Sequence, residues 1–414
     1  MPIQLRRIQR LLFAMLGALG LASAAPAADL WRQIDAAPTP LTALTLAEGG
    51  AAADPARASR WQQSIATLHA EAGEPRRALE VFPFGPGGHR NGFATESVSV
   101  PQGLRCEAAL PALRAAAREH RFVFINEAHH VPQTRVLTHA LLAALRAEGY
   151  THFAVEALHE TEADYLHRGY PSKRSGSYLA EPLFAELLRE AVRLGYRLVP
   201  YEHMGEGDAE AREAAQAQQL WERSIGRDPR AKVLVHAGYA HVDRSGERLF
   251  KIQPLAQRIE ARLGAAVLSV DQVDLRSDPA GREHPMYRPL LAHSGASTPQ
   301  VCRLDGKLWA LAPARNDVSV LLPDHGAEEK GPWFSLDGQR VPVAAAPLCA
   351  QRLPCQIEAR AVAEGADAVP ADRCVQRDGR ACTLYLAPGR YRLSGSDATG
   401  QTLGSTGISV AAGR

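Results

Sequence analysis

The sequence predicts an α/β fold, with a mainly parallel sheet flanked by helices, followed by a smaller C-terminal β-rich domain. Between residues 106 and 294, short apolar runs alternate with longer helical stretches, which is the pattern of crossover units in a parallel sheet. The runs are apolar at nearly every position, as expected for strands that are buried on both faces. After about Gly295 the helical period fades, and prolines and glycines separate short strand-like runs.

Five runs are expected to form the parallel strands. They span residues 122–125, 153–155, 197–201, 232–235 and 266–270. Helices are expected between and after them over residues 132–148, 181–194, 209–225 and 254–263. Pro132 suits a first helical turn, and Gly149, Gly195 and Gly264 suit helix ends. We therefore expect an α/β domain over residues 106–294 and a β-sandwich-like domain over residues 295–414, the latter including strand-like runs over 318–322, 355–359 and 382–386.

The N-terminus has the features of a secretory signal peptide. Three arginines precede an apolar run over residues 11–22, which is shorter than the roughly 20 residues that a membrane span needs. Small residues that fit a cleavage site follow, so we expect a leader over residues 1–27 and a periplasmic or secreted protein without a membrane anchor. Residues 28–105 are expected to form an N-terminal extension, with a helix over 57–72 and a loop over 84–88.

Charge and cysteine content narrow the function classes. The formal net charge of +2 over 414 residues gives no electrostatic reason to expect nucleic acid as a partner. The six cysteines of an exported chain are expected to form disulfides. Cys349 with Cys355 and Cys374 with Cys382 are the local pairings, which leaves Cys106 with Cys302, although six cysteines allow other connectivities.

Acidic and imidazole side chains follow each predicted strand of the sheet. They are Glu127, His129 and His130 after the first strand, Glu156 after the second, Glu202 and His203 after the third, His236 and His241 in and after the fourth, and Asp271 after the fifth. Ligands of open parallel sheets bind at the carboxyl ends of the strands, so these side chains are expected to meet there. Carboxylates and imidazoles in one place can share a proton, hold a cation or activate water.

Each of these residues also has a structural interpretation. Glu127 could cap the helix that follows it, and His129 and His130 could be ordinary loop residues. His203 and His236 are expected to be structural partners rather than catalysts, and Asp271 is the weakest candidate. The joint pattern favours a site, with Glu127, His129, His130, Glu156, Glu202 and His241 as its catalytic candidates. Arg135, in the first turn of the following helix, could bind an anionic group or an oxyanion.

Two of these segments resemble the erythromycin-esterase-like, ChaN-like and Tiki group of proteins. The first segment is Asn126-Glu127-Ala128-His129-His130 with Pro132 and Arg135, followed by Phe153-Ala-Val-Glu156. The second is Arg212-Glu213 with Ala217 and Gln219, followed by the strand and turn that end in His-Ala-Gly-Tyr-Ala-His241. The likeness covers residues 122–242. The sequence departs from the group's pattern at Asn126, where a glycine is usual, at Gln219, where an asparagine is usual, and at Gly238, where the esterases have a histidine.

The resemblance implies an α/β fold of this type with a Glu/His site at the sheet edge. Members use a histidine to activate water, a divalent metal for proteolysis, or haem as a ligand. By position, Glu127, Glu156 and His241 match, while the esterase spacing selects His130 and the ChaN-like spacing selects His129. A metal, if one is bound, would be held by Glu127, His130, Glu156 and His241, and Arg212 and Tyr239 join Arg135 as candidates for substrate binding.

Three functions remain open from the sequence. The first is a hydrolase that activates water, with or without a divalent metal, against an ester or amide in a small molecule or peptide. The second is a haem- or small-ligand-binding protein without catalysis, in which His129, His130 or Tyr239 is an axial ligand. The third is a non-catalytic envelope protein whose β domain binds a partner, suggested by the departures at Asn126, Gln219 and Gly238.

Overall fold

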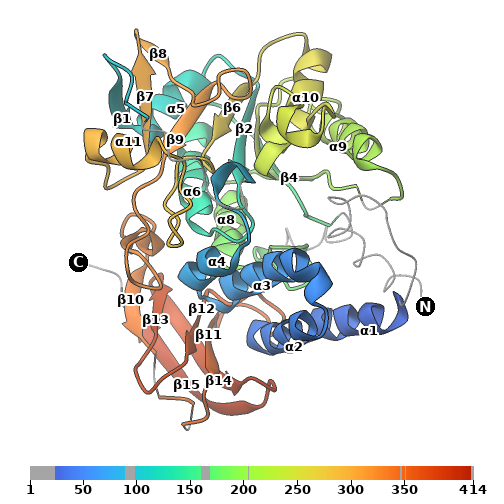
Figure 1. Ribbon diagram of the computed structural model, residues 1–414, viewed down its shortest axis with the longest axis vertical. Helices are drawn as coiled ribbons and strands as arrows, with labels where there is room; N and C mark the ends of the chain where they lie inside the picture. The colour runs from blue at the N-terminus through green and yellow to red at the C-terminus, as the bar shows by residue number, and fades with distance from the viewer. Residues whose placement is uncertain are drawn as a thin grey trace.

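The computed structural model describes residues 24–88, 98–159, 168–203, 205–345, 347–349 and 351–411. These residues form a helical N-terminal part, an α/β part and a C-terminal β part (Figure 1). The predicted leader over residues 1–27 lies mostly outside the described residues, and helix α1 (Ala24–Asp35) begins within its last four positions. No helix among the described residues is long and apolar enough to cross a membrane.

The centre of the α/β part is a nine-stranded, mostly parallel sheet. Six strands run parallel in the order β9-β6-β2-β5-β3-β4. Their bounds are β2 (Phe122–Glu127), β3 (His152–Val155), β4 (Arg197–Pro200), β5 (Val233–Gly238), β6 (Leu268–Asp271) and β9 (Val318–Leu321). The five strands expected between residues 122 and 270 are all present in this sheet. Its antiparallel edge is formed by β1 (Arg105–Ala108), β7 (Gln300–Leu304) and the short β8 (Lys307–Leu308).

The sheet continues beyond the predicted boundary at residue 294. Strand β9 pairs in parallel with β6, and β7 pairs with β9, so both belong to the central sheet and not to the C-terminal β part. Every residue of β9 is buried, which fits a strand covered on both faces better than a half-exposed sandwich strand. The prediction of a domain change at residue 295 is therefore wrong, and the central sheet extends to Leu321.

Helices cover both faces of the sheet, which gives three layers (Figure 1). Helices α5 (Ala109–Ala117), α6 (Gln133–Arg146) and α8 (Pro182–Arg193) share one apolar cluster with Val123 and Ile125 of β2. Helices α9 (Ala209–Arg223) and α10 (Leu255–Leu263) share another with Phe122 and Phe124. Successive β2 side chains thus enter opposite layers, as the two-residue period of a strand requires. Helix α11 (Tyr287–Ser294) packs near the antiparallel edge.

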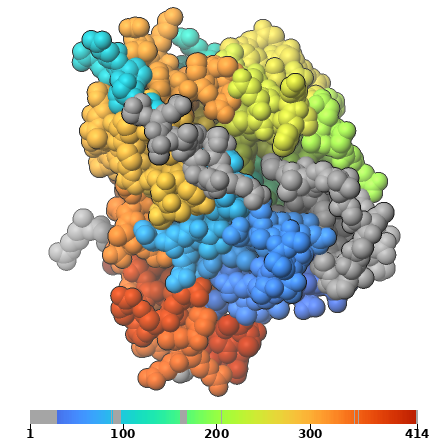
Figure 2. Space-filling model, viewed as in Figure 1, coloured from blue at the N-terminus to red at the C-terminus, as the bar shows by residue number. Residues whose placement is uncertain are grey.

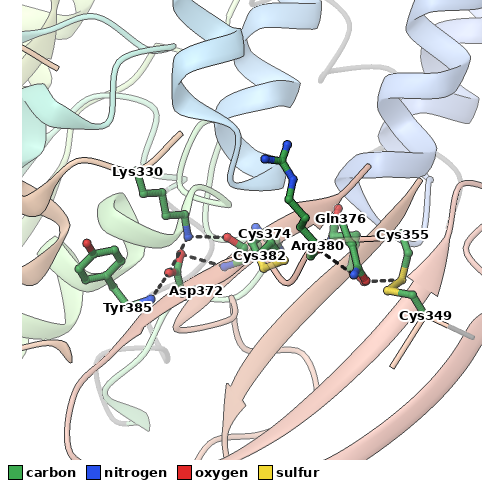
Figure 3. Close-up of a disulfide and its surroundings, with 11 residues drawn as sticks. Lys330, Cys349, Cys355, Asp372, Cys374, Gln376, Arg380, Cys382 and Tyr385 are labelled. Carbon is green, nitrogen blue, oxygen red and sulfur yellow. Dashed lines mark hydrogen bonds and ion pairs between the residues drawn. A yellow bond between two sulfur atoms is a disulfide. The ribbon is translucent and has the colours of Figure 1, made fainter. Parts of the chain in front are cut away.

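The C-terminal part contains two antiparallel sheets that share one apolar cluster. One sheet has the order β12-β11-β14-β15, and the other pairs β10 with β13. The bounds are β10 (Val341–Ala344), β11 (Cys355–Ala361), β12 (Asp372–Gln376), β13 (Thr383–Leu386), β14 (Gly389–Asp397) and β15 (Thr402–Val410). The disulfides Cys349–Cys355 and Cys374–Cys382 lie here (Figure 3). Cys106–Cys302 joins β1 to β7, so all three expected disulfides are confirmed.

The N-terminal helices lie between the other two parts. Figure 2 shows them on one face, above the C-terminal sheets and below the α/β part. They are α1, α2 (Pro40–Ala53), α3 (Ala58–Ala72) and α4 (Pro75–Val81), and α3 corresponds to the helix expected over residues 57–72. Short 3₁₀ turns complete the described elements: η3 (Pro55–Arg57), η4 (Pro86–Gly88), η6 (Tyr239–Val242), η7 (Glu247–Leu249) and η8 (Pro332–Ser335). A side chain at Gly73 would meet the Arg373 carbonyl oxygen at 2.0 Å, so the end of α3 sits directly on β12.

Candidate functional site

Glu127 ends strand β2 and holds two cationic or imidazole partners. Its Oε1 lies 2.6 Å from Nδ1 of His129, and its Oε2 lies 2.5 Å from a guanidinium nitrogen of Arg135. Arg135 is only 1 % exposed, and its other nitrogen lies 3.0 Å from Glu181. The guanidinium also donates to the His129 carbonyl oxygen over 3.0 Å. The buried Arg135 therefore fixes both the Glu127 carboxylate and the backbone of the following turn. It was expected to bind an anionic group of a substrate, but these contacts occupy its guanidinium.

The ring of His129 is held on both sides by tyrosines. Tyr178 stacks on it with ring centroids 3.9 Å apart and planes 6° from parallel, and Tyr239 meets it edge-on at 5.2 Å. Both tyrosines have positive φ values, 60° and 44°, a backbone conformation that side chains other than glycine rarely adopt. Such strain is characteristic of positions whose orientation matters for function.

Glu156 follows strand β3 and lies in a second charged group. Its Oε1 is 3.2 Å from Arg212 and 3.4 Å from Nε2 of His241, and its Oε2 accepts the Gly238 backbone N–H. Arg212 also contacts Glu202 at 3.1 Å. Glu202 accepts further hydrogen bonds from Gln216 and from the backbone N–H groups of Ala157 and His203. Glu202 is therefore saturated with donors and orients Arg212, although it was predicted to be catalytic.

His241, in the turn η6 after β5, lies between two carboxylates. Its Nδ1 is 2.5 Å from Glu213 and its Nε2 faces Glu156. Burial alone would lower the pKa of His241, but Glu213 and Glu156 outweigh burial and raise it to about 9. The imidazole is therefore cationic at neutral pH, which suits charge stabilisation and not proton abstraction.

Gly238 is where the two charged groups meet. A Cβ at this position would lie 2.5 Å from Cε1 and 2.8 Å from Nε2 of His129, and 3.0 Å from Oε2 of Glu156. The imidazole of His129 and the carboxylate of Glu156 thus occupy the space that any other residue would need. Glu127, His129, Glu156, Arg212 and His241 consequently form one charged cluster at the carboxyl ends of β2, β3 and β5.

The two central carboxylates remain ionised. Burial would raise the pKa of Glu127, but Arg135 and His129 outweigh it and hold this pKa below the usual value. Burial also opposes ionisation of Glu156, yet His241, His129 and Arg212 lower its pKa to about 2. With pKa values this low, both carboxylates are too weakly basic to serve as an efficient general base at neutral pH.

His130 lies outside this cluster. Its ring stacks on Phe82 of the N-terminal part with centroids 3.6 Å apart, and its Nδ1 lies 3.2 Å from the Tyr239 hydroxyl. Burial lowers the pKa of His130 well below its ordinary value, so the ring is neutral. Of the two neighbouring histidines, His129 is the one that lies beside Glu127 and Glu156.

Two other candidates, Asp271 and His236, have structural roles. Asn126 donates to Asp271 over 2.6 Å and accepts the backbone N–H of Gln272, which joins the ends of β2 and β6. His236 is fully buried inside β5, lies 3.2 Å from Thr138, and has a pKa that burial lowers to about 4.

Sequence reasoning missed several residues of the site. Glu213 was named beside Arg212 in the resemblance but not as a site residue, and for Gln216 the signal was its position one helical turn beyond Arg212 on α9. Tyr178 and Glu181 come from a loop far along the chain and had no local signal. Phe82 comes from the N-terminal part, to which no function had been assigned.

The residues proposed as metal ligands do not fit a divalent cation. Within the part of the chain that the structure describes, no group of three or more His, Cys, Asp or Glu side chains is arranged to hold a metal ion. Glu127 and Glu156 are each already paired with an arginine, and His130 faces Phe82 and Tyr239. Two guanidinium groups beside the carboxylates also supply the positive charge that a metal would bring.

The candidate haem ligands do not fit that group either. An axial ligand needs room for a whole porphyrin beyond its ligating atom, far more than a water molecule needs. His129 is covered by Tyr178 and packed against Gly238, and His130 is covered by Phe82. The hydroxyl of Tyr239 is occupied by His130.

Comparisons with known proteins identify no family. No protein-family model and no curated protein matches the sequence. Among solved structures, the type III effector HopBA1 aligns over 46 % of this chain and 96 % of its own, with 17 % identity and a TM-score of 0.29. RRSP, a MARTX toxin effector domain from Vibrio vulnificus, aligns over 56 % of this chain and 55 % of its own, with 16 % identity and the same TM-score of 0.29.

Proposed function

We propose that the protein is a metal-independent hydrolase in which His129 is the general base. The observation that carries this proposal is the 2.6 Å contact between Nδ1 of His129 and Oε1 of Glu127. With the Nδ1 proton donated to the carboxylate, the lone pair of Nε2 is available to accept a proton from water. The side chain of His129 is 19 % exposed, so water has access to it.

The surrounding charges suit the transition state of ester or amide hydrolysis. A water oxygen attacks the carbonyl carbon while its proton moves to Nε2 of His129. The oxyanion that forms lies beside the cationic His241 and Arg212, whose positions are fixed by Glu213 and Glu202. The intermediate then expels the alcohol or amine, which takes the proton back from His129. Glu127 and Glu156 stabilise the transient imidazolium.

The fold type, the cellular location and the substrate class are part of the same proposal. We infer from the residues shared with the erythromycin-esterase-like, ChaN-like and Tiki group that the α/β part has that group's fold. The three disulfides fit an oxidising compartment, and together with the leader-like N-terminus they support a periplasmic or secreted location. The substrate is then a small molecule or peptide that carries an ester or amide bond.

Turnover of a panel of nitrophenyl esters and acyl amides tests the proposal. His129→Gln is expected to lower kcat/KM by about 10²–10⁴-fold, because a general base contributes about that much. His120→Gln is the matched control, since His120 lies before β2, at the opposite end of the strand from the site, and its Nδ1 lies 2.9 Å from the Ala116 carbonyl oxygen. Wild-type turnover in His129→Gln, or no turnover by the wild-type protein on any member of the panel, would reject the proposal.

A further inference from the structure

The loop over residues 168–181, called here the bridging loop, connects the site to the C-terminal part. Its far end carries Tyr178, which stacks on His129, and Glu181, which holds Arg135. The loop packs against the residues that directly follow Glu156: Leu158 pairs with Gly176, and a Cβ on Gly176 would meet the Ala157 carbonyl oxygen at 1.9 Å. The positions of two site residues therefore depend on where this loop is held.

The C-terminal part holds the other side of the bridging loop. Ser172 forms a β-bridge with Ala368, and the backbone N–H of Val369 donates to the Pro171 carbonyl over 2.9 Å. The hydroxyl of Tyr170 accepts the backbone N–H of Gly365 over 2.9 Å. These contacts place the start of the loop against the segment between β11 and β12.

Arg373 of β12 joins the C-terminal part to the bridging loop. The side chain is fully buried, and one nitrogen donates to the Ala180 carbonyl over 2.7 Å and to the Glu71 carbonyl over 3.0 Å. Its Nε lies 2.9 Å from Glu358, which fixes the guanidinium within the sheet. Ala180 directly precedes Glu181, so Arg373 is connected to Glu127 through Ala180, Glu181 and Arg135.

We propose that Arg373 is a positioning residue for the site, through which the C-terminal part sets the orientation of Tyr178 and Glu181 and hence of His129 and Glu127. The C-terminal part is then a component of the catalytic unit and not an independent binding module. A guanidinium is needed because it can bond Glu358 and two backbone carbonyls at once. The single ammonium group of a lysine, on a shorter side chain, cannot contact all three in this geometry. This inference rests on the proposed function for its catalytic consequence, but its structural part can be tested without turnover.

The test is the NMR signal of the His129 ring in full-length protein that is isotopically labelled at histidine. His129→Gln assigns the signal, and Tyr178→Leu gives its position without the stacked ring. In Arg373→Lys we expect the signal to move toward the Tyr178→Leu position. If the ester assay shows turnover, kcat should fall by roughly tenfold to a hundredfold, since small displacements of a catalytic group have effects of that size.

Arg380→Lys is the matched control, because Arg380 lies in the same part, is 88 % exposed and pairs with Asp378 two residues away. If Arg373→Lys does not fold, Tyr170→Phe replaces it as the test. This variant removes only one contact between the loop and Gly365, so the His129 signal should shift in the same direction by a smaller amount. An unchanged His129 signal in folded Arg373→Lys, or in Tyr170→Phe if that variant must decide, would overturn the inference. A shifted signal in a protein that hydrolyses no ester would support the positioning role and reject the proposed hydrolase.

Discussion

Nδ1 of His129 lies 2.6 Å from Oε1 of Glu127, although the two residues are only two positions apart in the chain. Glu127 is the last residue of β2, and the turn that follows brings the imidazole back over the carboxylate. The Arg135 guanidinium bonds both the Glu127 carboxylate and the His129 carbonyl, so it closes this turn. The result is an oriented imidazole whose second nitrogen lies beside Gly238.

The two neighbouring histidines should differ strongly in their effect on activity. His130→Gln is expected to reduce turnover far less than His129→Gln, because His130 contacts Phe82 and Tyr239 and not the charged cluster. Its main effect should be lower stability, since a stacked buried ring is lost. Ester turnover and thermal unfolding of the two variants check this, and equal losses of kcat/KM would contradict it.

Gly238→Ala should inactivate the protein without unfolding it. The φ and ψ of Gly238 are −71° and 139°, which alanine adopts readily, so the backbone is not strained. The new methyl group would instead displace His129 and Glu156, and we expect about a hundredfold loss of turnover. Gly49→Ala is the control, since a Cβ there meets nothing within 4 Å. Wild-type turnover in folded Gly238→Ala would show that the two groups do not meet at this point.

Stability should fall at alkaline pH because of His241. The pKa of this histidine rises from 6.5 to about 9 in the folded protein because Glu213 and Glu156 outweigh burial. A raised pKa stabilises the fold fully below about 6.5, and the stabilisation, on the order of 3 kcal/mol, is lost as the pH rises to about 9. Glu213→Gln removes the stronger carboxylate partner, so its unfolding free energy should change less between pH 6.5 and 9 than that of the wild type. Equal pH dependence in both proteins would count against the His241–Glu213 pair.

The disulfide between Cys106 and Cys302 should stabilise the antiparallel edge of the sheet. It joins β1 to β7 across a sequence separation of 196 residues. Closing a long loop restricts the unfolded chain, so the paired change of both cysteines to serine should lower the unfolding free energy by about 2–5 kcal/mol. Denaturant unfolding measures this difference. Wild-type stability in the double variant would contradict a structural role for the bridge.

The sheet and its site edge were predictable because they depend on local patterns. Apolar runs and helix ends located the five strands, and the rule that ligands bind at strand ends placed Glu127, Glu156 and His241 together. The domain boundary was not predictable in the same way. Strand β9 lies among prolines and glycines, and only its pairing with β6 shows that it belongs to the central sheet.

The roles of individual site residues required three-dimensional contacts. His129 and His130 follow the same strand, and the choice between them depends on which way the turn directs each ring. Arg135 looked available at a helix start, but its burial between Glu127 and Glu181 is invisible in the sequence. Tyr178 is placed by the approach of Gly176 to Ala157, a long-range packing contact that no local pattern indicates.

The most direct test of the central claim is a double-variant cycle of Glu127→Gln and His129→Gln, measured as kcat/KM on the best ester of the panel. If Glu127 acts by orienting His129, the double variant should be no slower than His129→Gln alone, because residues that act as a unit are not additive. Losses that multiply in the double variant, or a Glu127→Gln protein with wild-type turnover, would contradict a Glu127–His129 catalytic pair.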